Sequence, residues 1–480
     1  MGWEESERPI VPSKAGNPHP GDPVEGWGRR ITEPQEGTMS GSSWPASIST
    51  KQARIATLAK QMPGAAMTSL SQHMDLEWLL EAYRRTRKDG AAGVDGQTAE
   101  AYAEHLEENL RALLSRAKSG TYRAPPVRRV HIPKGDGSKT RPIGIPTFED
   151  KILQRAVLML VEPVYEQDFY SLSYGFRPRR SARDASEALQ GALFKMDGGW
   201  VLDVDIASFF DTLDHGQLRD LLRRRISDGV VVRLIGKWLR AGVLEGGVVS
   251  HADAGTPQGG VISPLLANIY LHEVLDTWWV KDVLPRLRGR AELTRYADDF
   301  VMVFELESDA RRVHGVLPER FGRFGLTLHP DKTRLVDYRR PSPRGERRPG
   351  TFDFLGFKHY WGTSRKGLAT PMRKTSGKRL SRALKTIGTW MKRARHWPLE
   401  LQHDRLAAKL RGHFNYFGLP GNSRAIGAFR SEVLRRWHHW LARRSQRGQT
   451  WAKFQALLKR YPLPPARLTP RPRQLALANL

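Results

Sequence analysis

Two adjacent aspartates, Asp298 and Asp299, interrupt an apolar segment at residues 293–305 (LTRYADDFVMVFE). Successive residues of a strand point to opposite faces of a sheet, and neighbouring carboxylates repel each other. A tight hairpin relieves this conflict, because its turn holds both carboxyl groups at one end of two strands. Closely spaced carboxylates suit Mg²⁺, which binds one or two of them and keeps other positions for phosphates. An ordinary surface turn is the simpler interpretation, so the pair needs support from elsewhere in the chain.

That support comes from other segments that carry acids, cations or glycines. Residues 200–215 (WVLDVDIASFFDTLDH) predict an apolar strand that contains Asp203 and Asp205, and buried acids are costly unless they are paired or bind a ligand. The hairpin expected at 127–146 carries Lys134, Lys139 and Arg141 near its GDG turn, and Lys332 follows the acidic segments. Residues 255–260 (GTPQGG) would let the backbone approach a nucleotide closely. Two-metal phosphoryl transfer needs carboxylates of this kind, together with cations over the phosphates.

Positive charge is concentrated in the last quarter of the chain. The 480 residues have a net charge of +28, and residues 365–480 carry 27 Lys and Arg against three acids, a net charge of +24. Five tryptophans are interleaved with these cations. We therefore expect the C-terminal segment to bind a polyanion, although a solvated basic face is the alternative. Trp437 and Trp440 lie on the apolar stripe of a helix at 426–444, which favours packing over base stacking.

Composition excludes several classes of protein. The chain has no cysteine, which excludes disulfides, cysteine nucleophiles and zinc sites with cysteine ligands. It has no apolar run of about 18 residues and no signal peptide, so we expect no membrane association. The expected location is therefore intracellular. Residues 1–65 hold scattered Pro, Gly and Ser without periodicity, which predicts a disordered leader.

Hydrophobic periodicity predicts a mixed α+β protein that becomes purely helical after residue 365. The expected helices lie at 75–90, 101–120, 151–167, 219–226, 232–243, 310–325 and 426–444, with a further long helix opened by the Gly-rich loop within 255–279. The expected strands lie at 127–146, 200–215, 293–305, 326–338 and 351–361.

Seven motifs occur in one order between residues 75 and 460. They are RPIGIP (141–146), SYGFRPRRSA (173–182), DVDIASFFD (203–211), GTPQGGVISPLLANIYL (255–271), RYADDF (295–300), KT (332–333) and FLGF (354–357). The bacterial group II intron-encoded reverse transcriptase/maturase family has these motifs in the same order, and the chain resembles that family. The resemblance implies a right-hand polymerase, with a leader at 1–65, fingers and palm at 66–364, a helical thumb or maturase X domain at 365–447 and a basic extension at 448–480.

The resemblance also implies a role for each matching residue. Asp205, Asp298 and Asp299 would bind two Mg²⁺ ions, with Mn²⁺ as a substitute, and the Ile206 carbonyl would assist. Lys332 would act as a general acid, and Phe210 as the steric gate that favours dNTPs, with Phe209 in the core. The roles of Asp203, Asp211 and Asp214 stay open. The remaining nucleotide-binding residues would be Lys139, Arg141, Gln258 and Gly259, and the primer grip would be Phe354, Leu355, Gly356 and Phe357.

The implied partners are group II intron RNA, a DNA target or primer, and dNTPs. The implied location is the bacterial cytosol, associated with the nucleoid. Thumb helices would hold RNA through phosphates and shape, and the segment LRGHFNYFGLPGNS (410–423) is the strongest match there. The expected RNA-binding residues are Arg177, Arg179, Arg180, Lys374, Lys378, Arg379, Lys392, Arg393, Arg411, Asn415 and Tyr416.

The chain departs from many of the proteins it resembles in one respect. It shows no HNH endonuclease pattern, and we expect that domain to be absent, with the priming nick supplied from elsewhere. The leading interpretation is an RNA-directed DNA polymerase that also assists splicing of its host intron and copies it during retromobility. Two alternatives stay open: a splicing-only, RNA-binding maturase, and a domesticated reverse transcriptase used in defence or repair.

Overall fold

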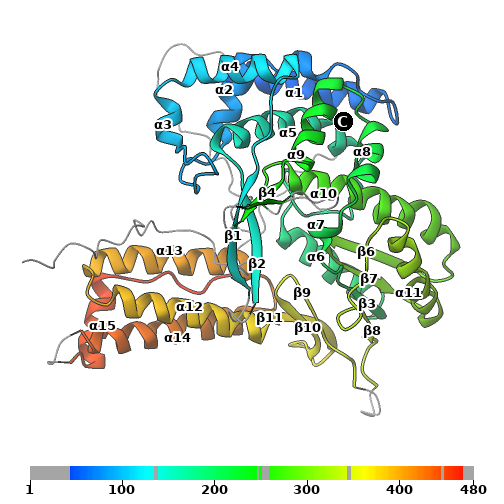
Figure 1. The fold of residues 1–480 in the computed structure, drawn as a ribbon. Coiled ribbons are helices and arrows are strands. Elements are labelled where there is room, and N and C mark those ends of the chain that lie inside the picture. Colours follow the sequence, from blue (N-terminus) through cyan, green and yellow to red (C-terminus); the bar gives the residue numbers. More distant parts are fainter. Residues whose placement is uncertain are drawn as a thin grey trace, which may run out of the picture.

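The computed structural model describes residues 44–134, 139–245, 248–250, 259–342, 348–444 and 448–468. The fold mixes helices and sheets, as the sequence predicts (Figure 1). Its first part is a helical layer around the long helix α5. The helices of this layer are α1 (Trp44–Gln61), η2 (Leu70–His73), α2 (Leu76–Arg85), α3 (Ala99–Ala103), α4 (Leu106–Ser119), α5 (Phe148–Asp168), α8 (His215–Arg223) and α9 (Gly229–Leu239).

Helix α1 corrects the prediction of a disordered leader at 1–65. Ile48, Ile55 and Ala59 of this helix are buried in the main core, and α1 packs along α5. The apolar residues of α1 are few and separated by polar and small residues, so periodicity alone did not reveal them. Packing on α5 supplies the stabilisation that the isolated segment lacks. Residues 1–43 lie outside the described part of the chain.

A long hairpin extends from the helical layer toward the C-terminal helices (Figure 1). Its strands are β1 (Val127–Lys134) and β2 (Lys139–Ile145), which pair antiparallel from Arg128↔Ile145 to Lys134↔Lys139. Strand β4 (Val243–Glu245) pairs parallel to the base of β1, and β5 (Val248–Ser250) pairs with β4. The hairpin predicted at 127–146 is therefore confirmed, whereas its turn residues lie outside the described part of the chain.

The central sheet has the strand order β6-β7-β3-β8, and all its neighbours pair antiparallel. Its strands are β6 (Ala291–Tyr296), β7 (Asp299–Phe304), β3 (Trp200–Val204) and β8 (Arg334–Asp337). One face packs on the main core through Leu202, Phe300 and Met302, against α11 (Glu307–Gly322). The other face packs on α6 (Ala182–Lys195) through Val201 and Val303. This alternation fixes the direction of every polar residue on the strands.

A helix that packs in the core beside this sheet changes from α-helical to π-helical winding along its length. α10 (Ser263–Leu271) leads into the π-helical segments η3 (His272–Thr277) and η4 (Trp279–Val283), and then into the short η5 (Leu284–Arg286). π-helical turns are rare and mark places where a side chain must take an unusual position. The remaining short helix, α7 (Phe209–Thr212), follows the end of β3.

A small sheet and a helical bundle complete the fold. The sheet has the order β11-β10-β9, with β9 (Phe352–Phe354), β10 (Phe357–Thr363) and β11 (Ala369–Thr375). The C-terminal bundle consists of α12 (Gly377–Ala394), α13 (Leu399–Phe417), α14 (Ser423–Ala442) and α15 (Trp451–Arg460), and it has a core of its own. Trp437 is buried in that core and Trp440 packs against it, which confirms their predicted packing role. In the described segments, no helix is both long and apolar enough to span a bilayer.

Candidate active site

The aspartate pair lies at a two-residue turn between β6 and β7. Tyr296 pairs with Asp299, so Ala297 and Asp298 form the turn, and Asp299 begins β7. Ala297 is buried and has a positive φ of 55°, a conformation that residues other than glycine rarely adopt. The predicted hairpin is confirmed, and its turn presents both carboxylates at one end of the central sheet.

Asp205 reaches the same end of the sheet from the neighbouring strand. The register pairs Asp203 with Val301, and Asp205 follows β3 two residues later. Asp205 therefore shares the face of Val201 on β3, and Asp299 shares the face of Val301 on the adjacent β7. The Asp205 carbonyl accepts a hydrogen bond from the His329 amide at 2.8 Å, which fixes the chain just after the strand. The structure thus brings together the three acids that the sequence predicted.

The electrostatics of these acids show how closely they interact. The protein around the turn partly desolvates Asp298 and Asp299, although both carboxylates still reach solvent. This desolvation raises the pKa of both groups. For Asp299, the charges of Asp298 and Asp205 add to the effect and raise the pKa to about 7. Three carboxylates that destabilise one another's charge gain from any cation placed among them.

Lysine and arginine side chains supply part of that positive charge. Lys332 Nζ lies 2.7 Å from a carboxylate oxygen of Asp205, which places this predicted residue in the site. Arg334 lies 3.3 Å from Asp203. Burial raises the pKa of Asp203 to about 6 against the opposing effect of Arg334. Asp203 is thus a partner of Arg334 on the same sheet face.

The donor atoms that the three acids offer are carboxylate oxygens. Within the described segments, no three His, Asp or Glu side chains converge closely enough to hold an ion. The chemistry of Asp205, Asp298 and Asp299 nevertheless fits Mg²⁺, because all three offer carboxylate oxygens and their mutual repulsion favours a shared cation. Binding would require the carboxylates to converge further and Lys332 to leave Asp205.

The predicted nucleotide-binding residues occupy different positions around the acids. The charge of Arg141, on β2, lowers the pKa of Asp298 and so opposes the desolvation described above, which places its guanidinium within electrostatic range of the turn. Gly259 has a φ of 121° and packs against β2, where a Cβ would lie 2.3 Å from the Gly144 carbonyl oxygen. Only glycine permits this close approach. The Lys139 side chain and Gln258 lie outside the described part of the chain.

The two phenylalanines after Asp205 differ in burial. Phe209 is buried in the main core, whereas Phe210 is half-buried and packs on its edge. Their ring centroids are 5.2 Å apart in an edge-to-face arrangement. Ile206 is buried and bridges to Leu328. The core role of Phe209 is confirmed, and the steric-gate role of Phe210 remains a prediction.

The FLGF segment forms a tight turn between β9 and β10. Phe354 pairs with Phe357, both rings are buried, and Leu355 and Gly356 make the turn with positive φ angles. The two aromatic side chains therefore act as core residues rather than as contact residues. Any contact of this segment with a primer falls to the turn.

Two of the predicted RNA-binding residues, Arg177 and Tyr416, make contacts within the protein that give them structural roles. The Arg177 side chain is only 4% exposed, forms an ion pair with Glu166 at 3.0 Å and donates to the carbonyls of Tyr170 and Ser173. The Tyr416 hydroxyl donates to the Leu355 carbonyl at 2.9 Å, and its ring stacks on Phe357. Both residues are held by the protein itself. Arg177 is buried, so its prediction as a surface RNA contact is wrong, whereas the half-buried Tyr416 remains a predicted RNA contact.

The other predicted RNA-binding residues reach the surface. Arg180 is half-buried and lies over the Tyr174 ring, and Arg379 is half-buried at the start of α12. Their role in RNA binding remains a prediction. The exposed members of the set are Arg179, Lys374, Lys378, Lys392, Arg393, Arg411 and Asn415.

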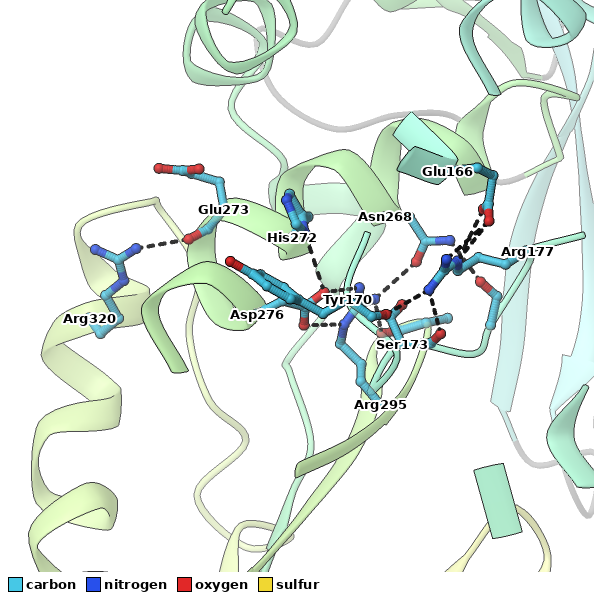
Figure 2. Close-up of polar contacts among 12 residues, drawn as sticks. Glu166, Tyr170, Ser173, Arg177, Asn268, His272, Glu273, Asp276, Arg295 and Arg320 are labelled. Atoms are coloured by element: carbon cyan, nitrogen blue, oxygen red, sulfur yellow. Dashed lines mark hydrogen bonds and ion pairs between the residues drawn. The ribbon is translucent and has the colours of Figure 1, made fainter. Parts of the chain in front are cut away.

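Sequence reasoning missed a buried polar cluster that contacts the Ala297–Asp298 turn (Figure 2). Arg295 and Asp276 are fully buried and form an ion pair, and Arg295 also bonds Asn268 and the Ala297 carbonyl. A signal was present, because Arg295 lies within an apolar strand and Asp276 within an apolar helix. Ionisable residues in such segments need a buried partner.

Comparison with known families identifies a reverse transcriptase domain in this chain. Residues 132–359 match the family model described as reverse transcriptase (RNA-dependent DNA polymerase). Protein YkfC of Escherichia coli (strain K12) is 38% identical over 325 residues, which cover 60% of this chain and 84% of YkfC. The chain therefore belongs to the reverse transcriptase family.

Further relatives are intron-encoded proteins and maturases. Group II intron-encoded protein LtrA of Lactococcus lactis subsp. cremoris is 42% identical over 184 residues, 38% of this chain and 30% of LtrA. Nuclear intron maturase 2, mitochondrial, of Arabidopsis thaliana is 27% identical over 235 residues, 40% of this chain and 30% of the maturase. The chain thus spans less than a third of these two longer relatives, while its family membership agrees with the order of motifs in the sequence.

Proposed function

We propose that this protein is an RNA-directed DNA polymerase that binds group II intron RNA, assists its splicing and copies it into DNA. The observation that carries this proposal is the meeting of Asp205, Asp298 and Asp299 at one end of β3 and β7. Lys332 and Arg141 approach the same acids from two other segments. Carboxylates combined with cations in this way suit the transfer of a nucleotide from a triphosphate.

The proposed reaction is an in-line attack of a primer 3′-hydroxyl on the α-phosphate of a dNTP, with pyrophosphate leaving. Asp205, Asp298 and Asp299 would hold two Mg²⁺ ions, which supply charge stabilisation to the attacking and leaving oxygens. Lys332 would give a proton to the leaving pyrophosphate, and Arg141, with Lys139, would neutralise the triphosphate. Phe210 would exclude a ribose 2′-hydroxyl.

The parts of the fold then take the roles of a right-hand polymerase. The helical layer and the β1–β2 hairpin would be the fingers, the central sheet the palm, and the C-terminal bundle the thumb. The charge of +24 in residues 365–480 supports phosphate binding by the bundle. The small sheet β9–β11 joins the palm to the thumb and carries the proposed primer-grip turn.

Primer extension on an RNA template with Mg²⁺ tests the proposal. We expect extension by the wild type and its loss, to the level of a protein-free control, in Asp298→Ala. A matched control is Asp282→Ala, because Asp282 on η4 has a side chain 51% exposed and pairs with Arg286 rather than with the residues of the site. Equal activity of Asp298→Ala and the wild type would contradict the assigned site.

Primer extension, combined with assays of RNA binding and intron splicing, separates the alternative functions. A pure wild type that binds intron RNA but does not extend a primer would support the splicing-only maturase. Extension without any effect on intron splicing, from a gene with no adjacent ribozyme sequence, would support a reverse transcriptase used in defence or repair.

A further inference from the structure

The turn that carries Asp298 is conformationally strained. Ala297 adopts a φ of 55° while buried, and its alanine side chain gives none of the local hydrogen bonds by which Asn or Asp tolerates this region. Such a conformation persists only where the surrounding structure determines it. The residues that bond the Ala297 backbone therefore decide where Asp298 points.

Arg295 is the residue that reaches this backbone. Its side chain is 0% exposed, and its Nη1 donates to the Ala297 carbonyl at 3.1 Å and to the Asn268 side-chain oxygen at 2.9 Å. Its Nε and Nη2 donate to the two carboxylate oxygens of Asp276 at 2.7 and 2.5 Å. This planar, bidentate arrangement fixes the guanidinium in one orientation, as a lysine ammonium could not.

The partners of Arg295 come from the wound helix described above. Asn268 lies on α10 and Asp276 on the π-helical η3, and both are buried (Figure 2). Burial alone would raise the pKa of Asp276, but Arg295 and His272 hold that pKa below its usual value, so the carboxylate stays charged.

A second layer holds the other side of the turn. Residues 172–175 run beside β6, where the Arg295 amide donates to the Leu172 carbonyl and the Tyr174 amide to the Arg295 carbonyl. A Cβ on Gly175 would lie 2.3 Å from the Ala297 amide nitrogen, so the two backbones touch. Asn268 Nδ2 donates to the Gly175 carbonyl. Arg177, two residues later, forms an ion pair with Glu166 and so anchors this segment to α5.

We propose that Arg295, Asp276 and Asn268 form a positioning cluster that sets the Ala297–Asp298 turn for catalysis. This inference rests on the proposed polymerase function. The cluster touches neither substrate nor reacting atoms, and it acts through the backbone of the turn. Its loss should reduce kcat, since a shift of about 1 Å in a reacting group lowers rate by roughly 10²-fold, while the KM for dNTP and RNA affinity stay unchanged.

The decisive variant replaces the ion pair by apolar residues of similar size, Arg295→Met with Asp276→Leu. Such replacements of a buried pair are often neutral for stability, so the variant should fold with a thermal midpoint near that of the wild type. We expect kcat to fall by about 10²-fold. A single Arg295→Lys, which keeps the charge but not the fork, should show the same loss of kcat. Wild-type kcat in either variant would overturn the proposal.

Arg225 and Asp168 provide a matched control. They form another buried ion pair, with side chains 6% and 23% exposed, and Arg225 also bonds backbone carbonyls of the N-terminal segment rather than the turn. Arg225→Met with Asp168→Leu should leave kcat at the wild-type value. A similar loss of kcat in this control would show a general effect of removing ion pairs and would overturn the specific role of Arg295.

Amide hydrogen exchange separates this inference from the proposed function. The amides of residues 296–299 should exchange faster in Arg295→Met/Asp276→Leu than in the wild type, whether or not the protein extends a primer. A wild type without extension would overturn the proposed function alone. Unchanged exchange at the turn would overturn the positioning cluster.

A different observation, a basic cavity between α8 and α9, carries a second inference. The cavity has a volume of about 410 Å³ and is lined by Arg219 and Arg223 from α8 and by Arg233 and Arg240 from α9 and its end. Ser227, two glycines and one valine complete the lining, so within the described residues neither an acid nor an aromatic ring lines it. Three of these arginines are exposed.

The cations here are weakly neutralised by the protein. Among the described contacts, the nearest carboxylate is that of Asp220, 3.9 Å from Arg223, and Arg233 donates to the Lys118 carbonyl. Burial and the charges of Arg233, Arg123 and Arg240 lower the pKa of the neighbouring Lys237. Such a cluster gains from a bound anion, and without an aromatic platform it suits phosphates rather than bases.

We infer that this cavity binds backbone phosphates of RNA, at a site separate from the C-terminal bundle. The inference deepens the RNA binding included in the proposed function. Arg223→Ala with Arg240→Ala should weaken RNA binding and reduce the slope of log affinity against log salt by roughly 1.4–1.8 for two lost phosphate contacts. The kcat of primer extension at saturating template should not change.

A matched control removes two exposed arginines elsewhere, Arg311→Ala on α11 with Arg323→Ala at the end of that helix. Each of them already pairs with a glutamate of α11. This control should keep the wild-type salt slope in an anisotropy titration. An equal slope in wild type and Arg223→Ala/Arg240→Ala would overturn the cavity alone, as would a defect confined to the KM for dNTP. A wild type that binds no RNA would overturn the proposed function as well.

Discussion

The central sheet region and the C-terminal bundle use arginine in opposite ways. Around the sheet, Arg177 and Arg295 have side chains that are 4% and 0% exposed, and each has a carboxylate partner. In the bundle, Arg393 and Arg411 are exposed, and residues 365–480 hold only three acids. The comparison teaches that an arginine's role depends on the acids near it, and not on the local density of positive charge.

The salt dependence of RNA binding is the largest effect that this comparison predicts. If the bundle makes six to ten phosphate contacts, affinity should fall by about 10³–10⁵-fold between 50 and 200 mM salt, because binding releases counterions from RNA. Filter binding at several salt concentrations measures the slope. A nearly flat slope would contradict the bundle as the main RNA surface.

The substitution of one arginine in each region sharpens the contrast. Arg177→Ala should lower the free energy of unfolding by about 3–5 kcal/mol, because it leaves Glu166 partly buried without its partner. Arg393→Ala should leave stability within about 0.5 kcal/mol, as expected for an exposed site, and should weaken RNA binding. Urea unfolding measures the stability of both variants, and RNA titration measures their affinity. Equal losses of stability would contradict the different roles assigned to Arg177 and Arg393.

The sheet that joins the two regions should be sensitive to acid. His359 is buried on β10, stacks on Phe352 and neighbours Arg373, and burial, with the charge of Arg373, lowers its pKa to about 3. The unfolded chain takes up a proton near pH 6.5 and the folded chain only near pH 3. Stability from this residue is therefore complete above pH 6.5 and is lost as the pH falls toward 3, by roughly 2 kcal/mol at pH 5.

His359→Phe should flatten this dependence, since phenylalanine binds no proton. Unfolding measured by circular dichroism from pH 7 to 5 provides the test. The exposed His105 offers a control, because His105→Gln should keep the wild-type pH profile. A variant at His359 with an unchanged profile would refute the assignment.

The smallest effect concerns neighbouring residues of α13. Tyr416→Phe removes the hydrogen bond to the Leu355 carbonyl and should cost about 0.5–1.5 kcal/mol of stability. Asn415→Ala, at an exposed position, should cost none and should affect RNA binding instead. Thermal unfolding of both variants measures these losses, and a larger loss in Asn415→Ala than in Tyr416→Phe would contradict the structural role of the Tyr416 hydroxyl.

The features of the site that could be predicted from the sequence depend on local patterns of residues. The conflict between Asp298 and Asp299 on a strand indicated a hairpin turn, and the alternation of β3 placed Asp205 on the same face as Asp203. The core role of Phe209 and the packing of Trp437 also followed from sequence. These features depend on neighbours within a few residues, where the geometry of a strand or helix is fixed.

The wrong predictions all depend on distant contacts. Arg177, Arg179 and Arg180 form one basic run, yet only Arg177 meets Glu166, which lies 11 residues earlier and approaches through the fold. Helix α1 is stabilised by α5, about a hundred residues away. The sequence itself contains no signal that distinguishes such partners from solvent.

By itself, the sequence determined the order of motifs, the acids of the turn and the placing of positive charge near the C-terminus. The tertiary structure decided which charges are neutralised inside the protein and which remain for a ligand. Arg295 illustrates the reason: its distance from Asp276 is 19 residues in the chain and 2.5 Å in the fold. Strand alternation is a local property, whereas the burial of a charge depends on partners that only folding brings together.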